Sequence, residues 1–134
     1  MLKDIEILTD AKVGVAMVYE LNDSLENVWN VYIVNLNNQP ITNVLVTCKG
    51  FGLIEDENRE TSTMRYFIGD MEARSFLKIE PINPDLFVLN NEYFLTFYEH
   101  GKILDKRITF KPNSIQINLL QEIGILNKPG ILLT

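Results

Sequence analysis

Histidine and cysteine carry much nucleophilic and acid–base chemistry, and this chain of 134 residues has one of each. His100 precedes Gly101, so we expect it at the tip of a hairpin turn, with no spaced catalytic partner in the sequence. Cys48 lies in an alternating apolar run, where a free cysteine is typically a small buried hydrophobe. A single cysteine also excludes an intramolecular disulfide and a cysteine-based zinc site. We therefore predict no catalytic residue and a protein that is not an enzyme.

Carboxylates form one dense cluster, in which Glu55, Asp56 and Glu57 are followed by Glu60. Oxygen ligands of this kind could hold Ca²⁺, but the run lacks the Asp-x-Asp-x-Asp-Gly spacing that positions such ligands. A charged run between apolar stretches is more typical of solvated chain. We expect a loop over residues 55–60, with no metal and no cofactor.

The least acidic part of the chain, residues 61–78, contains the candidate binding residues Arg65, Tyr66 and Arg74. If residues 64–68 and 75–79 pair as adjacent antiparallel strands, these side chains form one basic patch with an aromatic ring. RNA-binding modules use such patches for phosphate contact and base stacking. The alternative is that the arginines only balance neighbouring acids across a hairpin.

The elements that would position these residues are β-strands. Val, Ile and Thr supply 32 residues and Ala only three, and β-branched side chains favour strands over helices. Seven apolar stretches separated by turn residues are the expected strands: 13–21, 28–34, 44–51, 63–68, 75–82, 93–98 and 103–110. In the fifth, Leu77 and Ile79 are expected on one face, with Lys78 and Glu80 on the other.

Strands at this spacing predict an all-β fold, an antiparallel β-sandwich of the immunoglobulin or fibronectin III type. Trp29 is the expected core anchor. A Greek-key or up-and-down barrel is the alternative architecture. The length fits one domain over residues 1–134, with a core over 13–111 and a tail over 112–134.

The tail has a different pattern from the core. Ser114 is placed to cap a short helix whose apolar residues would be Leu119, Leu120 and Ile123. The sequence then ends on an apolar segment, a candidate interaction tail: Ile131, Leu132 and Leu133. Such a segment is costly in water, so we expect it to dock on its own domain or on another copy.

Several short strings spread over residues 28–133 carry a family resemblance. They are Trp29-Asn30-Val31-Tyr32, Asn43-Val44-Leu45-Val46-Thr47 with Lys49-Gly50, Thr61-Ser62-Thr63-Met64-Arg65, Lys78-Ile79-Glu80, Leu89-Asn90-Asn91-Glu92-Tyr93 and Asp105-Lys106. On these strings the chain resembles a family of small single-domain bacterial proteins of unestablished function, often labelled as a phenylalanyl-tRNA synthetase subunit or domain. The resemblance implies a sandwich fold and supplies no active site.

The motifs with which a class II synthetase holds ATP are missing from the sequence. These are an Arg-x-Glu strand and a Gly-rich strand that ends in Arg, and the one similar string, Arg59-Glu60-Thr61, has the wrong order. We therefore expect at most an accessory role in aminoacylation.

Charge and hydropathy narrow the functional classes further. A net charge of −6 disfavours nucleic-acid binding, because phosphate contact needs a positive surface. No run approaches 18 apolar residues, and acids interrupt the first residues, so we expect no membrane span, no signal peptide and a cytoplasmic protein.

Three functions remain open. We expect first a non-catalytic interaction module, working through a protein partner or self-association at edge strands. The alternative is an accessory tRNA-binding or phenylalanyl-tRNA synthetase-associated domain. A third reading is a small-ligand or carbohydrate binder, for which a tyrosine among residues 32, 66, 93 and 98 would have to line a cleft.

Overall fold

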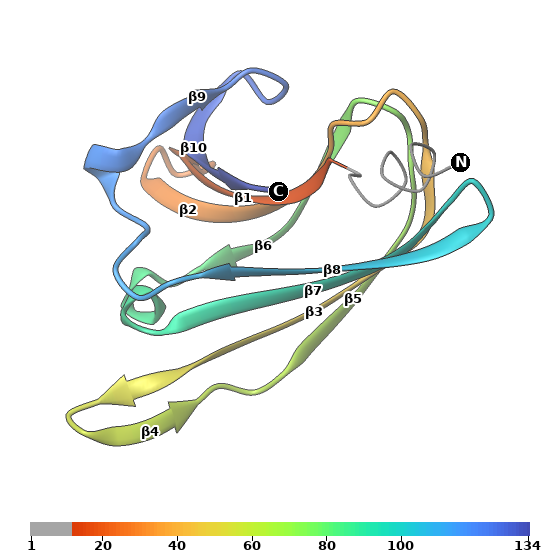
Figure 1. Ribbon diagram of the computed structural model, residues 1–134. Coiled ribbons are helices and arrows are strands. Elements are labelled where there is room, and N and C mark those ends of the chain that lie inside the picture. The colour runs from red at the N-terminus through yellow and green to blue at the C-terminus, as the bar shows by residue number, and fades with distance from the viewer. Residues whose placement is uncertain (1–11) are drawn as a thin grey trace.

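Two antiparallel β-sheets packed face to face make up the computed structural model, which describes residues 12–134 (Figure 1). Sheet A has the strand order β6-β2-β1-β10-β9. Sheet B has the order β4-β3-β7-β8, with β5 also paired to β3. The prediction of an all-β chain is confirmed.

The strands are β1 (Val13–Leu21), β2 (Asn27–Asn35), β3 (Ile41–Ile54), β4 (Glu57–Glu60), β5 (Met64–Met71), β6 (Ser75–Ile82), β7 (Asn90–Glu99), β8 (Lys102–Phe110), β9 (Gln121–Ile123) and β10 (Lys128–Leu133). Two single-turn 3₁₀ helices, η1 (Pro84–Val88) and η2 (Ile117–Leu119), complete the elements of the described chain. Within residues 12–134, no helix has the length and apolar character needed to cross a membrane.

Seven of these ten strands match the predicted ones, and β4, β9 and β10 are additional. The predicted loop over residues 55–60 is in fact the turn and second strand of a hairpin. Glu55 and Asp56 adopt left-handed backbone, with φ of 52° and 65°, and Ile54 pairs with Glu57 across the turn. All four residues of β4 are exposed. Because neither face of this strand is buried, its sequence does not alternate between apolar and polar residues, and the strand could not be predicted from that pattern.

The predicted helix in the tail is wrong. Residues 117–119 form only one 3₁₀ turn, and Ile123 lies in β9. The tail instead returns along sheet A, where β10 pairs with β1 and places Leu133 opposite Val15 and Ile131 opposite Met17. Pairing with the open edge of β1 satisfies backbone groups that a short isolated helix would leave exposed to water. The apolar end of the described chain therefore docks on its own domain.

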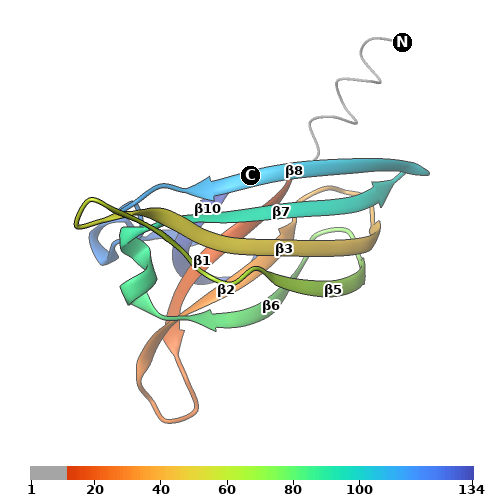
Figure 2. The same ribbon diagram turned by 90° about the horizontal axis from the view of Figure 1, so that it is seen from below.

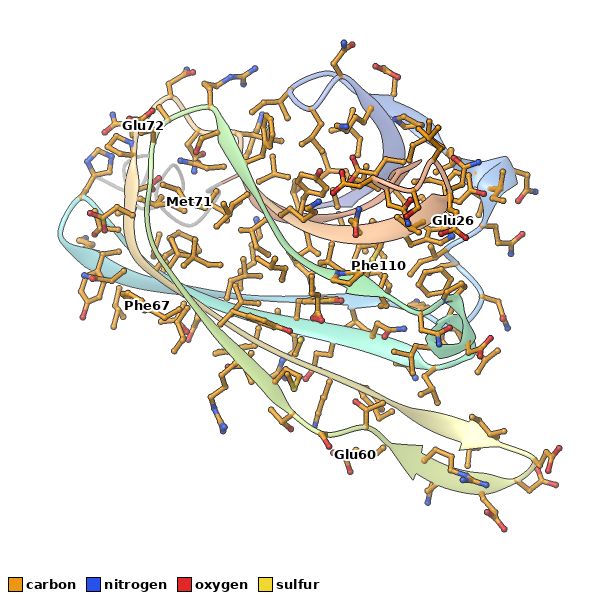
Figure 3. The ribbon with its side chains drawn as sticks, turned by 180° about the vertical axis from the view of Figure 1, so that it is seen from behind. Glu26, Glu60, Phe67, Met71, Glu72 and Phe110 are labelled. Atoms are coloured by element: carbon orange, nitrogen blue, oxygen red, sulfur yellow. The ribbon has the colours of Figure 1, made fainter. Side chains whose placement is uncertain are left out.

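The main core lies between the sheets. Trp29 is buried there as predicted, 4.9 Å from the ring of Tyr19 and 5.3 Å from the edge-on ring of Phe87. Phe110 also lies between the two sheets (Figure 3). A second, smaller cluster covers the opposite face of sheet A, where the curled β9–β10 hairpin brings Leu126 against Val18 (Figure 1).

Candidate functional site

The predicted basic patch is not formed, because β5 and β6 do not pair. The chain crosses from sheet B to sheet A between them, so β5 pairs with β3 and β6 with β2. Arg65 and Tyr66 are successive strand residues and so point to opposite faces of sheet B. Arg74 lies in the turn after β5, where its guanidinium donates to the carbonyl of Leu36 at 3.2 Å. At about 3.3 Å per strand residue, the run from Arg65 to Met71 alone spans about 20 Å.

Neither His100 nor Cys48 is placed for catalysis. His100 is exposed in the turn between β7 and β8, which it forms with Gly101 as predicted. Cys48 is buried on β3, and burial, with the nearby Glu80 carboxylate, raises its pKa to about 12, so it stays a protonated thiol near neutral pH. Among residues 12–134 no three His, Cys, Asp or Glu side chains gather as a metal site would need.

The outer face of sheet B carries a contiguous group of exposed apolar side chains. Figure 2 looks onto this face, across β8, β7, β3 and β5. We call the group the outer apolar patch: Phe67, Ile103, Leu45 and Tyr98, with exposed fractions of 73, 59, 37 and 37%. Leu45 lies directly opposite Phe67 on β5, and Tyr98 directly opposite Ile103 on β8. Leu45 also pairs with Thr96, two residues from Tyr98, so the patch crosses the sheet.

Charges of both signs surround this patch. Two ion pairs lie on the same face, Lys49 with Glu60 at 3.3 Å and Arg107 with Glu92 at 3.7 Å. Arg65 on β5 and Asp105 on β8 face outward at opposite edges, and neither has an ion-pair partner within the described chain. Asp70, also exposed and outward-facing on β5, adds a fourth carboxylate, so this face carries three cations and four carboxylates.

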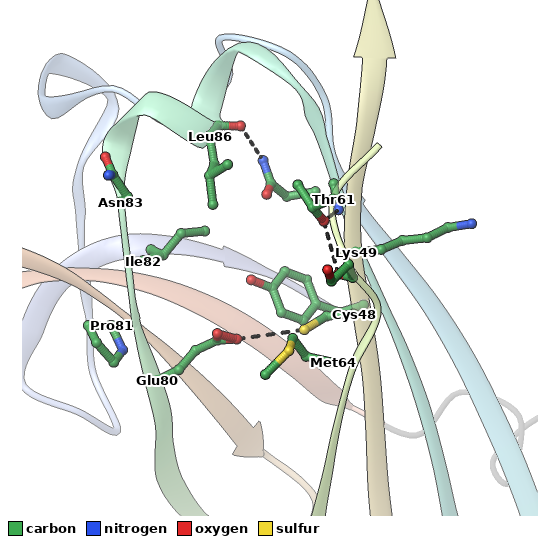
Figure 4. Close-up of a pocket in the computed structure, with 13 residues that line it drawn as sticks. Cys48, Lys49, Thr61, Met64, Glu80, Pro81, Ile82, Asn83 and Leu86 are labelled. Atoms are coloured by element: carbon green, nitrogen blue, oxygen red, sulfur yellow. Dashed lines mark hydrogen bonds between the residues drawn. The ribbon is translucent and has the colours of Figure 1, made fainter. Parts of the chain in front are cut away.

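A second feature is a pocket where the edge of sheet A meets sheet B. This pocket, which we call the seam pocket, is lined by Glu80 of β6, Cys48 of β3, and Asn91 and Tyr93 of β7, together with other polar and apolar residues. Its volume is about 260 Å³. Figure 4 shows the Glu80 carboxylate directed at the Cys48 thiol, which donates to it at 3.6 Å.

A β-bulge directs Glu80 into the pocket. Lys78 pairs with Tyr32 and Glu80 with Val31, so Ile79 is an extra residue that shifts the alternation of β6. The prediction that Glu80 shares the solvent face with Lys78 is therefore wrong. The sequence of β6 alternates regularly and gives no sign of a bulge. The inward direction of Glu80 could therefore not be predicted from it.

The tyrosines that could have marked a cleft have different environments. Tyr93 is 3% exposed and lines the seam pocket. Tyr66 donates its hydroxyl to Glu80 at 3.0 Å, and Tyr32 donates to Glu20 at 2.8 Å on the other side of sheet A. Tyr98 belongs to the outer apolar patch. One tyrosine of the four thus meets the condition set for a small-ligand binder.

Comparisons of this chain with protein-family models, with curated proteins and with solved structures find no match.

Proposed function

We propose that this protein is a non-catalytic interaction module that self-associates through the outer face of sheet B. The outer apolar patch carries the proposal, because four neighbouring side chains expose between 37 and 73% of their surface on one sheet face. Contiguous exposed apolar side chains with a polar rim are typical of protein interaction sites.

The charges on this face favour a second copy of the chain as the partner. The chain as a whole has a net charge of −6, which repels another copy, whereas the outward charges on this face, three cations and four carboxylates, nearly cancel. In a two-fold packing of the two faces, β5 of one copy lies over β8 of the other. The edge that carries Arg65 in each copy then faces the edge that carries Asp105 in its partner.

Nucleic acid fits the same face less well. Binding of phosphates needs a surplus of cations, and here the carboxylates outnumber the cations by one. The guanidinium of Arg107 lies over the Phe94 ring at 5.4 Å and forms an ion pair with Glu92, so it is already engaged. The accessory tRNA-binding or synthetase-associated role, which the family resemblance implies, is therefore left as an outcome of the test.

We also propose a fibronectin III-like arrangement for the seven predicted strands. Strands β6, β2 and β1 lie in one sheet and β5, β3, β7 and β8 in the other, the division found in that fold. The β9–β10 hairpin would be an addition at the β1 edge. One core cluster draws on both sheets and on Leu133 of the tail, which supports a single domain. The buried free thiol of Cys48 suits a reducing cytoplasm.

The test is sedimentation velocity of the full chain and of two single variants, Phe67→Glu and Ile103→Glu. Both side chains are mostly exposed, so the fold tolerates the change, but a carboxylate buried within the interface opposes association. We expect the parent chain to sediment as a dimer and both variants as monomers. Leu25→Glu, at a side chain 78% exposed in the β1–β2 turn, is the matched control and should remain a dimer.

Two outcomes would overturn the proposal. One is a parent chain that stays monomeric at every concentration. The other is a dimer that both glutamate variants leave intact. Saturable tRNA binding in a parallel filter assay, lost in Arg65→Glu, would replace self-association by the nucleic-acid role.

A further inference from the structure

The seam pocket suggests a second binding activity, independent of the outer face. It opens between β6 of sheet A and β3, β5 and β7 of sheet B, so both sheets contribute to its walls. Its volume of about 260 Å³ lies below the range of about 300–1,000 Å³ typical of sites for drug-sized ligands. The pocket is therefore suited to a small molecule or to the end of a longer one.

Glu80 gives this pocket its charge. Its carboxylate accepts hydrogen bonds from two neutral donors, the Cys48 thiol at 3.6 Å and the Tyr66 hydroxyl at 3.0 Å. No cation of the described chain forms an ion pair with it. The Lys49 side chain extends away from the pocket in Figure 4, and its ammonium pairs with Glu60. A half-buried carboxylate without a cation is costly, so the pocket favours a positively charged guest.

Two further polar groups at the pocket have unused capacity. Tyr93 is 3% exposed, and its hydroxyl has no hydrogen bond among residues 12–134. Asn91 is 5% exposed and uses its amide nitrogen for the carbonyls of Leu86 and Leu89, at 2.9 and 3.2 Å. The Asn91 carbonyl oxygen is thus left as an acceptor. Neither oxygen is among the fully buried polar atoms without a partner, so both are open to the pocket and can accept hydrogen bonds from a bound donor.

Apolar side chains also line the pocket, with Met64, Ile82 and Leu86 beside the acceptors. We propose that the seam pocket binds a small alkylammonium ion. Its N–H groups donate to the Glu80 carboxylate, the Tyr93 hydroxyl oxygen and the Asn91 carbonyl oxygen, and its alkyl chain contacts the three apolar side chains. A carboxylate or phosphate ligand would instead face Glu80 without a cation to receive it.

The experiment uses n-butylammonium as the probe, added to the full ¹⁵N-labelled chain at neutral pH and followed by NMR. We expect saturable shifts at amides that line the seam pocket, such as those of Met64 and Ile82. The neutral n-butanol and the anionic butyrate have the same chain length and should bind at least about tenfold more weakly, because neither donates charged N–H groups. This comparison needs no variant and does not depend on folding of a mutant.

Two variants assign the binding to its residues. Glu80→Gln keeps the shape and removes the charge, and should weaken n-butylammonium binding about tenfold or more. Tyr93→Phe removes one hydroxyl and should weaken it a few-fold. Glu60→Gln, at a carboxylate outside the pocket, is the matched control and should bind as the parent does. Equal binding of n-butanol or butyrate, shifts outside the pocket, or unchanged affinity in Glu80→Gln would each overturn the proposal. None of these results bears on the dimer.

Discussion

The carboxylate of Glu20 links neighbouring strands of sheet A through hydrogen bonds and an ion pair. Its side chain is only 9% exposed on the outer side of sheet A. One oxygen accepts from Asn30 and Tyr32, at 2.7 and 2.8 Å, and the other pairs with Lys128 of β10 at 2.7 Å. Glu20 therefore links three neighbouring strands, β2, β1 and β10.

Replacing this carboxylate should destabilise the protein in a pH-dependent way. Burial raises the pKa of Glu20, but hydrogen bonds from Lys128, Asn30 and Tyr32 outweigh it, so the pKa lies below the ordinary value of 4.5. Because the pKa of Glu20 is lower in the folded protein than in the unfolded one, its charge stabilises the fold at any pH above the unfolded-state pKa. This stabilisation is lost as the pH falls through the folded-state pKa. We expect Glu20→Gln to lower the free energy of unfolding by about 1–3 kcal/mol at pH 7, and by much less at pH 3.

Urea unfolding at the two pH values measures this difference. Glu122→Gln, at an exposed residue of β9, is the control and should change stability little at either pH. An equal loss at pH 3 and pH 7 would mean that packing, and not the charge of Glu20, holds these strands.

Protonated groups around Glu80 predict sensitivity to alkali. Burial and the neighbouring Glu80 carboxylate raise the pKa of the Cys48 thiol from 9.0, and that of the Tyr66 hydroxyl from 10.0, to about 12. For such groups the stabilisation is complete below the unfolded pKa and is lost as pH rises through the folded pKa. We expect the urea midpoint to fall between about pH 9 and pH 12, and to fall less steeply in Cys48→Ala. The same slope in the variant would contradict the assignment to the thiol.

At the scale of elements, the attachment of β10 to β1 depends on a close backbone approach at Gly130. A Cβ atom there would lie 2.6 Å from the carbonyl oxygen of Met17 and 2.7 Å from the Cδ1 of Ile123. Because backbone cannot move aside cheaply, we expect Gly130→Ala to destabilise the fold by about 1–3 kcal/mol. Gly124→Ala is the control, since a Cβ at Gly124 meets nothing within 4 Å. Thermal unfolding compares the two, and equal midpoints would show that β10 is not held as described.

Some of the strands could be predicted from the pattern of apolar residues, and others could not. Strands with one buried face, such as β3 and β8, were predicted because the core imposes the alternation that the sequence displays. The exposed β4 carries no such alternation, and the helical spacing of Leu119, Leu120 and Ile123 was overridden by the open edge of β1. Neither candidate site was predicted from the sequence. The seam pocket depends on the bulge at Ile79, and the outer apolar patch depends on which strands become neighbours in sheet B.

For the whole molecule, the distribution of charge is more informative than its sum. The net charge of −6 argues for mutual repulsion in solution, yet the outer face of sheet B is nearly balanced in charge and apolar at its centre. Phe67 and Ile103 lie at opposite sides of this face, so a partner that covers one covers both. Self-association removes this apolar surface from water.

The most direct test of this account is the mass of the full chain in solution, measured by light scattering across about a hundredfold range of concentration. The account predicts a mass that approaches twice the 15.4 kDa of the chain at high concentration and falls toward 15.4 kDa on dilution. In Phe67→Glu it should remain at 15.4 kDa throughout. A parent chain that stays at 15.4 kDa over the whole range would contradict self-association through sheet B.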